Sequence, residues 1–344
     1  MSKLVDHLAD LTGFRDRDQL DVTLVGAMKD LLKPQMVVIY RRVGEAGSEH
    51  WLTRARLTAT TLVATFDPVW AELSSLPALD DHPHRLQCME SQSAIEIAGQ
   101  PHITIFPVAT ERDVVGVMEV ETEQPLSSES KRLVGSILRI YRNFQGLLDY
   151  SERDTLTGLL NRKTFDEAFL KASAEQQLVA NEGKGDRRSV AGGPASSWLG
   201  VIDIDHFKRV NDTYGHLIGD EVLLLLSRLM RASFRFHDRL YRFGGEEFVV
   251  LMRCDNETDA GVAFERFRNH TENYSFPQVG RITVSIGFTA LRVGDTPSGA
   301  FERADKAVYY VKEHGRNRVC SYTELTAKGE LTEDDDKTGD VELF

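Results

Sequence analysis

Two clusters of carboxylates are the residues in this 344-residue chain whose spacing suggests chemistry. In VIDIDHFKRVND, Asp203 and Asp205 alternate at the end of a strand-like run, so both side chains project to the same face. In YRFGGEEFVVL, Glu246 and Glu247 follow two glycines inside another strand-forming run. Neighbouring strands of one sheet would bring Asp203 beside Glu246, and like charges so close are costly unless a cation lies between them. Metal-assisted phosphoryl transfer is a common reason for such a site.

The turn after the first cluster offers donors for an anion. His206, Phe207 and Lys208 lead into a predicted helix, whose free backbone N–H groups suit phosphate oxygens, while Lys208 would add a cation. A carboxylate at the same place is a hard oxygen ligand for Mg²⁺. Taken alone, each segment also fits a simpler structure. The first could be an acid that caps a helix, and the second a hairpin turn whose glutamates face water.

Length and composition predict a two-domain cytoplasmic protein. The chain is longer than one hydrophobic core usually serves. No apolar run reaches the roughly 18 residues that span a bilayer, so no membrane partner is expected. The N-terminus also lacks the pattern of a signal peptide. The three cysteines, Cys88, Cys254 and Cys320, suggest no disulfide framework.

The net charge of −12 is concentrated in part at the C-terminus. Residues 324–344 contain eight acidic and two basic side chains, so we expect an acidic disordered tail over 323–344. The charge on the remaining chain does not suggest a nucleic-acid-binding surface. A small anionic ligand held by local cations and a metal is compatible with it.

From about residue 198 onward, strand and helix patterns alternate, which predicts an α/β domain with a central sheet. The strands are WLGVIDI, the two runs around the double glycine, and RITVSIGFT. We expect helices near 219–231, 259–270 and 300–313. A helix over 164–180 and a Gly/Ser-rich surface loop over 181–197 precede them.

The first 125 residues predict a smaller α+β module, and a long helix follows it. A helix over 20–33 precedes strands at 36–42 and 50–57, and residues 102–122 predict two more strands. The long helix has apolar residues at alternating intervals of four and three: Leu133, Ile137, Ile140, Phe144 and Leu147. This heptad seam predicts a paired helix that holds two chains together. One amphipathic helix packed on its own module would show the same pattern.

Six stretches, in order, resemble the GGDEF family, the diguanylate cyclases. GGEEF is similar to the family signature, DTLTGLLNR to its opening motif, and DIDHFKRVNDTYGHLIGDEVL to its nucleotide-binding segment. RFHD resembles its RxxD inhibitory motif, TVSIGFT its late strand, and ADKAVYYVKEHGRNRV its final helix. The resemblance implies an α/β catalytic domain over 154–322. Its fold would be a central, mainly antiparallel sheet flanked by helices, as in polymerase palms and nucleotide cyclases.

The family condenses two GTP molecules into cyclic di-GMP and releases two pyrophosphates. The resemblance implies that Asp203, Glu246 and the Ile204 carbonyl bind Mg²⁺, with Mn²⁺ as a substitute. It makes Glu246 a candidate base for the attacking 3′-hydroxyl, although a metal-bound carboxylate is a weak base, and gives Glu247 a supporting catalytic role. The implied substrate contacts are Asn211 and Asp220 to guanine, Gly245 to ribose and α-phosphate, and His206, Phe207, Lys208, Lys312 and Arg316 to phosphates.

The product requires a second GTP in antiparallel orientation, so two chains must face each other as a homodimer. Arg235 and Asp238, with Arg266, match the family's site for inhibition by cyclic di-GMP, although RFHD alone would also fit a surface ion pair. There are two alternatives. The first is a domain that binds GTP or cyclic di-GMP without turnover, but degenerate members of the family usually lose the acids at the positions of Asp203 or Glu246, and both are present here. The second is a cyclase that makes a cyclic mononucleotide, which shares the metal chemistry but lacks this motif set.

The N-terminal module, 1–125, resembles a GAF-like sensor domain in its order of elements, with a PAS-like module as the alternative. Residues 126–153 would be its signalling helix or coiled-coil linker. The ligand or partner that the module senses does not follow from the sequence. Four residues could suggest a metal or haem there, but loop histidines beside prolines are more often structural. They are His82, His84, Cys88 and His102.

Overall fold

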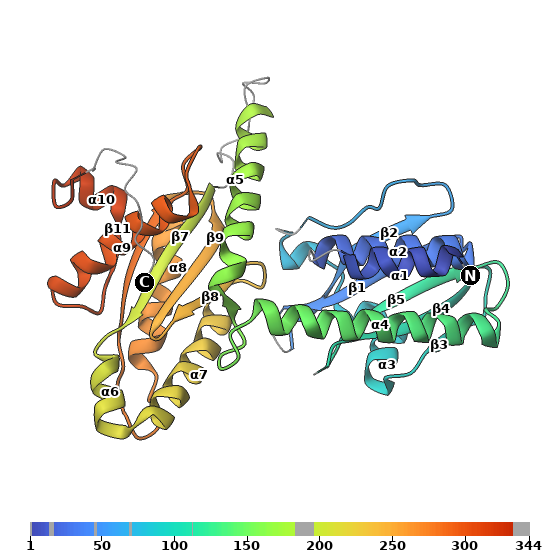
Figure 1. The fold of residues 1–344 in the computed structure, drawn as a ribbon, viewed down its shortest axis with the longest axis horizontal. Helices are drawn as coiled ribbons and strands as arrows, with labels where there is room; N and C mark the ends of the chain where they lie inside the picture. The colour runs from blue at the N-terminus through green and yellow to red at the C-terminus, as the bar shows by residue number, and fades with distance from the viewer. Residues whose placement is uncertain are drawn as a thin grey trace. The chain divides into compact units, whose positions relative to one another are not determined.

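The chain forms two units, each with its own sheet (Figure 1). The computed structural model describes residues 2–13, 17–44, 47–68, 71–111, 113–182 and 196–332. Unit 1 comprises residues 1–151 and unit 2 residues 152–344. Within the described residues, none of the helices combines the length and hydropathy needed to cross a membrane.

Unit 1 is built on a five-stranded antiparallel sheet in the order β2-β1-β5-β4-β3. The strand pairs predicted at 36–57 and 102–122 are confirmed. The strands are β1 (Met36–Val43), β2 (His50–Thr58), β3 (Ile95–Ile97), β4 (His102–Ala109) and β5 (Val114–Thr122). The helices are α1 (Ser2–Gly13), α2 (Arg17–Leu32), α3 (Pro83–Ser91) and α4 (Ser128–Glu152), with short 3-10 turns η1 (Leu73–Ser75) and η2 (Leu79–Asp81).

Helices cover both faces of this sheet and bury a separate core on each. On one face, α1, α2 and α4 pack their apolar residues against alternate residues of β1, β2, β4 and β5, such as Val37, Ile39 and Met118. On the other face, α3 contributes Cys88 and Met89 to a smaller core. Successive residues of a strand point to opposite faces of the sheet, so alternate residues enter the two cores. This pattern is typical of a sheet that is covered on both sides.

The long helix α4 packs on its own unit through a stripe next to the predicted seam. The buried stripe is Val134, Ile137, Tyr141, Gln145 and Leu148. Of the predicted seam residues, Ile137 is buried, three pack at the edge of the core, and Leu147 is 67% exposed. The prediction of a seam free for a second chain was therefore partly wrong, because the helix uses most of that side to cover its own sheet.

Unit 2 has a six-stranded sheet in the order β11-β10-β7-β9-β8-β6. The three central pairings are antiparallel and the two outer ones, β10 with β11 and β6 with β8, are parallel. The predicted mainly antiparallel sheet is confirmed. The strands are β6 (Leu160–Asn161), β7 (Ser196–Ile204), β8 (Arg239–Gly244), β9 (Glu247–Cys254), β10 (Val284–Ala290) and β11 (Val319–Ser321). The 3-10 turn η3 (Arg162–Thr164) follows β6.

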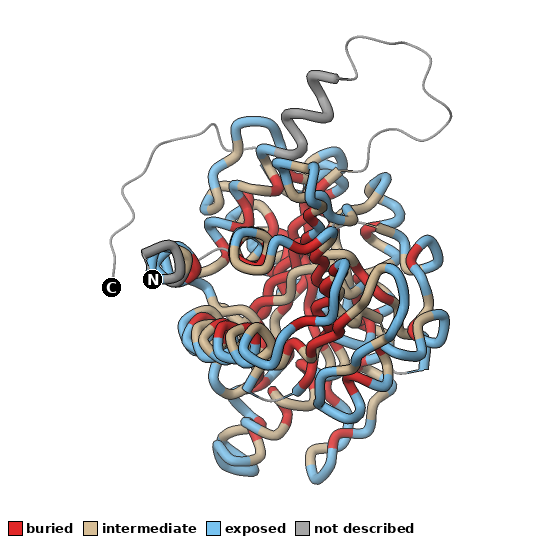
Figure 2. Tube along the Cα trace, turned by 90° about the vertical axis from the view of Figure 1, so that its right-hand side faces the viewer, coloured by how far each residue is buried: buried red, intermediate tan, exposed pale blue. Residues whose placement is uncertain are grey.

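Helices also cover both faces of the second sheet. Figure 2 shows buried residues mainly in the interior of the trace and exposed residues mainly at its outside. One core lies under α6 (Phe207–Tyr214), α7 (His216–Ser233) and α8 (Glu257–Asn273). The other lies under α5 (Phe165–Glu182) and α9 (Pro297–Glu313). Most of the predicted loop over 181–197 lies outside the described residues; residue 182 ends α5, and 196 begins β7.

Part of the predicted disordered tail is folded. Helix α10 (Tyr322–Ala327) follows β11, and its first turn is capped by the Ser321 hydroxyl, which accepts a hydrogen bond from the Glu324 backbone N–H. Tyr322 and Leu325 are buried against Ala307 of α9. These two apolar residues explain why disorder was wrongly predicted to start at 323: the acidic composition begins before the last hydrophobic contact ends. Residues 333–344 lie outside the described residues.

Candidate active site

Asp203 lies at the end of the central strand β7 and faces helix α9. In the sheet register it is opposite Glu247 of β9 on one side and Ser285 of β10 on the other. Leu199 and Val201, which precede it on the same face of β7, belong to the core under α5 and α9. The alternation of the strand therefore continues from an apolar core into a carboxylate that is 14% exposed.

Glu246 lies in the tight turn that joins β8 to β9. The turn consists of Gly245 and Glu246, and Gly245 has φ +47°, the left-handed conformation that glycine adopts without strain. Because Glu247 pairs with Asp203, the turn brings Glu246 to the same end of the sheet. The predicted approach of the two acidic clusters through neighbouring strands is confirmed.

The carboxylates at this edge repel one another, so each makes ionisation of its neighbours less favourable. Burial raises the pKa of Glu246, and the Asp203 carboxylate raises it further. Burial also raises the pKa of Glu247, with Asp305 of α9 and Asp203 adding to the effect. The pKa of Asp203 is raised by burial, while its hydrogen bond to Lys312 opposes the rise. The edge of the sheet therefore holds more negative charge than its immediate surroundings neutralise.

Lys312, which the resemblance associates with phosphate, pairs with Asp203. Its Nζ is 2.7 Å from Asp203 Oδ2. Helix α9 can lie this close to the sheet because β10 has a glycine beneath it. A Cβ on Gly287 would lie 2.2 Å from the carbonyl oxygen of Ala304. The lysine is thus placed over the carboxylates by the packing of the helix on the strand.

A brace fixes the turn that carries Glu246. The Arg242 guanidinium donates to the Gly245 carbonyl from Nε (3.2 Å) and Nη2 (2.9 Å). Its Nη1 donates to Asp154 Oδ1 at 3.0 Å, and the same oxygen accepts from the Thr157 backbone N–H and hydroxyl. The motif DTLTG is therefore connected to the hairpin through one arginine.

The segment after Asp205 carries the predicted phosphate and guanine contacts. His206 has φ +59°, and the side chain of Phe207 is buried in the core, which leaves the main chain of Phe207 for a ligand. Lys208 is exposed on α6. Asn211 of α6 contacts the start of α7, because a Cβ on Gly219 would lie 1.9 Å from Asn211 Oδ1. This contact brings Asn211 close to the residue preceding the exposed Asp220.

Arg316 follows the end of α9. It is half-buried and has φ +60°, and the next residue, Asn317, has φ +47°. The Arg316 backbone N–H donates to the Val311 carbonyl at 2.9 Å. Two successive non-glycine residues in the left-handed region are uncommon and need support from their surroundings.

The three residues of the predicted inhibitory site are grouped beyond the end of α7. The Arg235 backbone N–H donates to Asp238 Oδ2 at 2.8 Å, and Arg266 donates to the Ser233 carbonyl. Burial raises the pKa of Asp238 to about 6, while Arg235 and Arg266 act in the opposite direction. Asp238 Oδ1 is buried without a hydrogen bond, and His237 Nε2 is 3.8 Å away.

Comparison with known proteins identifies unit 2. Residues 151–318 match the family described as diguanylate cyclase, GGDEF domain. This part of the chain is a GGDEF domain. The chain is 36% identical over 211 residues to diguanylate cyclase DgcP of Pseudomonas aeruginosa, which covers 58% of this chain and 29% of that protein. It is 37% identical over 172 residues to diguanylate cyclase DgcZ of Escherichia coli K12, which covers 49% and 52%. The chain thus spans about half or less of these relatives.

Two solved structures of DgcB from Caulobacter crescentus, both in complex with c-di-GMP, are also similar to this chain. The GGDEF domain of DgcB is 33% identical, with a TM-score of 0.44, and the match covers 50% of this chain and 96% of that one. The coiled coil and GGDEF domain together are 30% identical, with a TM-score of 0.46, and the match covers 57% and 100%.

The donor set of this GGDEF domain fits a divalent cation. Within the described ranges, no three His, Cys, Asp or Glu side chains converge on one point. The available donors are the Asp203 and Glu246 carboxylates and the Ile204 carbonyl, all hard oxygens of the kind that Mg²⁺ prefers. The mutual repulsion that raises the pKa of Glu246 is the feature that a cation would relieve.

Sequence reasoning missed several residues of this site. Asp305 shares a face of α9 with Lys312, two helical turns away, and raises the pKa of Glu247. The spacing of seven residues was a signal that could have found it. No local signal joins Arg242 to Asp154, because 88 residues separate them.

Proposed function

We propose that this chain is a diguanylate cyclase, which condenses two GTP molecules into cyclic di-GMP and releases two pyrophosphates. The observation that carries the proposal is the convergence of Asp203, Glu246 and Lys312 at one edge of the sheet of a GGDEF domain. The carboxylates of Asp203, Glu246 and Glu247, together with Lys312, lie at a partly buried edge that suits a triphosphate with its cation.

In the proposed reaction, the 3′-hydroxyl of one GTP attacks the α-phosphorus of the other. The new O3′–P bond forms as the bond from the α-phosphorus to the pyrophosphate oxygen breaks. The 3′-hydroxyl of the second nucleotide then attacks the α-phosphorus of the first in the same way, which closes the ring and releases the second pyrophosphate. A bound Mg²⁺ or Mn²⁺ would neutralise charge on the phosphates and polarise the α-phosphoryl group. Glu246, in the turn at the same end of the sheet as Asp203, would accept the hydroxyl proton. Glu247, held opposite Asp203, supports it.

The remaining contacts select and orient the nucleotide. Asn211 and Asp220 hydrogen-bond guanine, whose N1–H and N2–H₂ donors suit a carboxylate and differ from adenine. Gly245 has no Cβ, and the space that a Cβ would occupy is open, with no other heavy atom within 4 Å. Ribose and α-phosphate can therefore lie against its backbone. The backbone at His206 and Phe207, with Lys208, Lys312 and Arg316, holds the phosphates.

We also propose that the enzyme works as a homodimer and is regulated. One chain has one such edge, so the two nucleotides must be presented by two chains. Leu147 and Tyr150, both largely exposed on α4, are available to such a partner. Unit 1 would be a GAF-like sensor module, a proposal supported by its antiparallel sheet with helices on both faces. Arg235, Asp238 and Arg266 would bind cyclic di-GMP as an inhibitor.

The proposal is tested with purified full-length chain, GTP and Mg²⁺, with chromatographic identification of products. Asp203→Ala and Glu246→Ala should each abolish formation of cyclic di-GMP, a loss of at least about a hundredfold. Asp255→Ala is the matched control, an exposed acid on the same unit outside the site. Turnover retained in either site variant would contradict the assignment. Wild-type chain that binds GTP but forms no product would show a binding module instead.

A further inference from the structure

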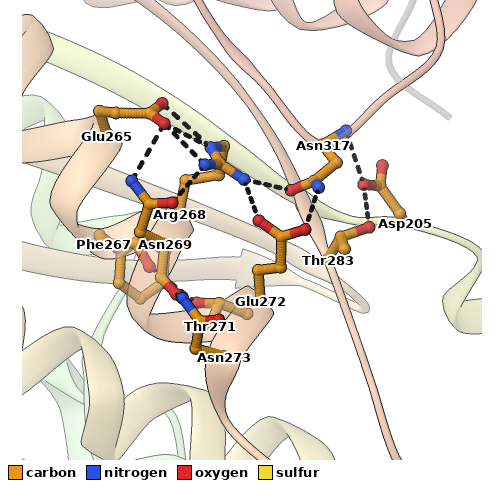
Figure 3. A network of polar contacts seen from close by, with 10 residues as sticks. All are labelled: Asp205, Glu265, Phe267, Arg268, Asn269, Thr271, Glu272, Asn273, Thr283 and Asn317. Carbon is orange, nitrogen blue, oxygen red and sulfur yellow. Dashed lines mark hydrogen bonds and ion pairs between the residues drawn. The ribbon is translucent and has the colours of Figure 1, made fainter.

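The turn that carries Arg316 is gripped from both sides by residues that have no part in the proposed contacts with GTP. We propose that Asn317 is a positioning residue, held by Asp205 on one side and by Arg268 with Glu272 on the other, which fixes Arg316 for the triphosphate. The inference rests on the proposed function, because the proposed binding of a triphosphate is what Arg316 would be positioned for. Figure 3 shows the network, which extends from α8 through Asn317 to Asp205.

The first grip acts on the backbone. Asp205 is 6% exposed, and all its contacts are made within the domain. Its Oδ1 accepts from the Ser285 hydroxyl at 2.6 Å, and its Oδ2 accepts from the Thr283 hydroxyl at 2.6 Å and the Asn317 backbone N–H at 3.1 Å. The Asp205 carboxylate therefore ties the turn to the sheet edge that holds Asp203.

The second grip acts on the Asn317 side chain. Its Oδ1 accepts from Arg268 Nη1 at 2.7 Å, and its Nδ2 donates to Glu272 Oε1 at 3.0 Å. Arg268 is 8% exposed and is itself held by Glu265 and Glu272, with Nη1 2.7 Å from Glu272 Oε2. Hydrogen bonds to these charged groups are among the stronger ones in proteins. The oxygen and the NH₂ group of the Asn317 side-chain amide thus each have a hydrogen-bond partner.

The backbone shows why a grip is needed. Arg316 and Asn317 have φ +60° and +47°, the left-handed region that non-glycine residues adopt only at a cost. Such a conformation persists when surrounding contacts determine it. Asparagine also tolerates it better than most residues. Arg316 lies four residues after Lys312, which is paired with Asp203. The contacts of Asn317 therefore hold Arg316 at a fixed position relative to Lys312, the other predicted phosphate-binding residue of this segment.

The decisive variant is Asn317→Gly, because glycine accepts the left-handed backbone and only the side-chain contacts are lost. Binding is measured with 3′-deoxy-GTP, which has no 3′-hydroxyl to act as the nucleophile, and with GMP, which lacks the β- and γ-phosphates. We expect an approximately tenfold weaker affinity for 3′-deoxy-GTP and an unchanged affinity for GMP. Asn269→Ala is the matched control. Its side chain belongs to the same network on α8 but does not touch the turn, and it should leave both affinities unchanged.

A double-mutant cycle with Arg316→Ala separates positioning from general structural damage. If Asn317 acts through Arg316, the double variant should bind 3′-deoxy-GTP no more weakly than Arg316→Ala alone. Fully additive losses, an equal loss for GMP, or an unchanged affinity in Asn317→Gly would each overturn the inference. If that variant does not fold, Glu272→Ala removes one side-chain partner at a half-exposed position and should give the same selective loss. Cyclic di-GMP formation by the wild-type chain reports separately on the proposed function.

Discussion

Arg242 links the first turn of the GGDEF domain to the hairpin that carries Glu246. Its guanidinium is 12% exposed and reaches both the Gly245 carbonyl and Asp154. A planar group with five donors can make these contacts at once, whereas an ammonium group presents a single point of charge. The shape of the turn therefore depends on one side chain that does not itself contact the reacting atoms.

We expect both Arg242→Ala and Arg242→Lys to lower kcat for cyclic di-GMP formation by about tenfold to a hundredfold, because small displacements of catalytic groups have effects of this size. Arg228→Ala is the control, an exposed arginine on α7. Steady-state kinetics at saturating GTP measures the effect. Full activity in Arg242→Lys would mean that charge alone is sufficient and that the fork-like contact is unnecessary.

Asp238 predicts a pH dependence of stability. Burial raises its pKa from the ordinary 3.8 to about 6, so the folded state binds its proton more readily than the unfolded state. The corresponding stabilisation is fully present below about pH 4 and is lost as the pH rises through about 6.

Relative to Asp238→Asn, which does not titrate, wild-type chain should lose at most about 3 kcal/mol of unfolding free energy between pH 4 and 7. Denaturant unfolding of unit 2 at several pH values measures the difference, with the exposed Asp255→Asn as control. If the unfolding free energies of wild type and Asp238→Asn changed in parallel with pH, the pKa of Asp238 would not be shifted in the folded state.

At the scale of elements, the packing of α9 on β10 determines where Lys312 lies. The contact is made possible by Gly287, which has Ala304 directly above it. Gly287→Ala should lower the unfolding free energy by about 1–3 kcal/mol through overpacking, and should lower activity by moving α9. In the control, Gly261→Ala on α8, the new Cβ would meet only Phe288 at 3.5 Å, and it should be neutral or slightly stabilising. Equal stabilities of the two variants would contradict this account of the helix position.

The elements could be predicted where the sequence has a strong local period. Strands β1, β2, β4 and β5 were located within about one residue, and β7 was recognised from its uninterrupted apolar run. The region around α3 was not legible, because its helix of nine residues has little amphipathic pattern. In α4 the period was read correctly, but most of the buried positions lie one residue after the predicted ones. The buried stripe includes Gln145 and Tyr141, whose polar groups are paired with each other, so apolar residues alone did not mark it.

The acidic residues of the site could be predicted from the sequence, whereas the residues that hold them in position could not. Alternation on β7 and the glycine turn were sufficient to bring Asp203 and Glu246 together. The roles of Asp205, Arg242 and Asn317 depend on tertiary contacts between residues that are far apart, such as the 112 residues between Asp205 and Asn317. Local propensity does not contain such pairings. Strand alternation alone did not distinguish Asp203 from Asp205, although the family resemblance assigned the metal to Asp203. The structure shows that Asp205 already has three hydrogen-bond donors.

At the scale of the whole molecule, the proposed chemistry requires two chains, and unit 1 is proposed to regulate them. Unit 1 keeps α4 anchored through buried polar contacts: the Tyr141 hydroxyl donates to Asp21 and accepts from Gln145 Nε2 at 2.8 Å. Such a buried network is sensitive to rearrangement, because each unpaired group would be costly. In the proposed regulation, a signal received by unit 1 would act on α4, which ends at Glu152, the first residue of unit 2.

The central claim is tested most directly by the product of full-length chain with GTP and Mg²⁺. The account predicts cyclic di-GMP with two pyrophosphates released for each molecule, and a specific activity that rises with chain concentration until the dimer is complete. Mass spectrometry of the nucleotide, together with a pyrophosphate assay, measures both. Formation of cyclic GMP, or bound GTP without any product from an assembled dimer, would contradict it.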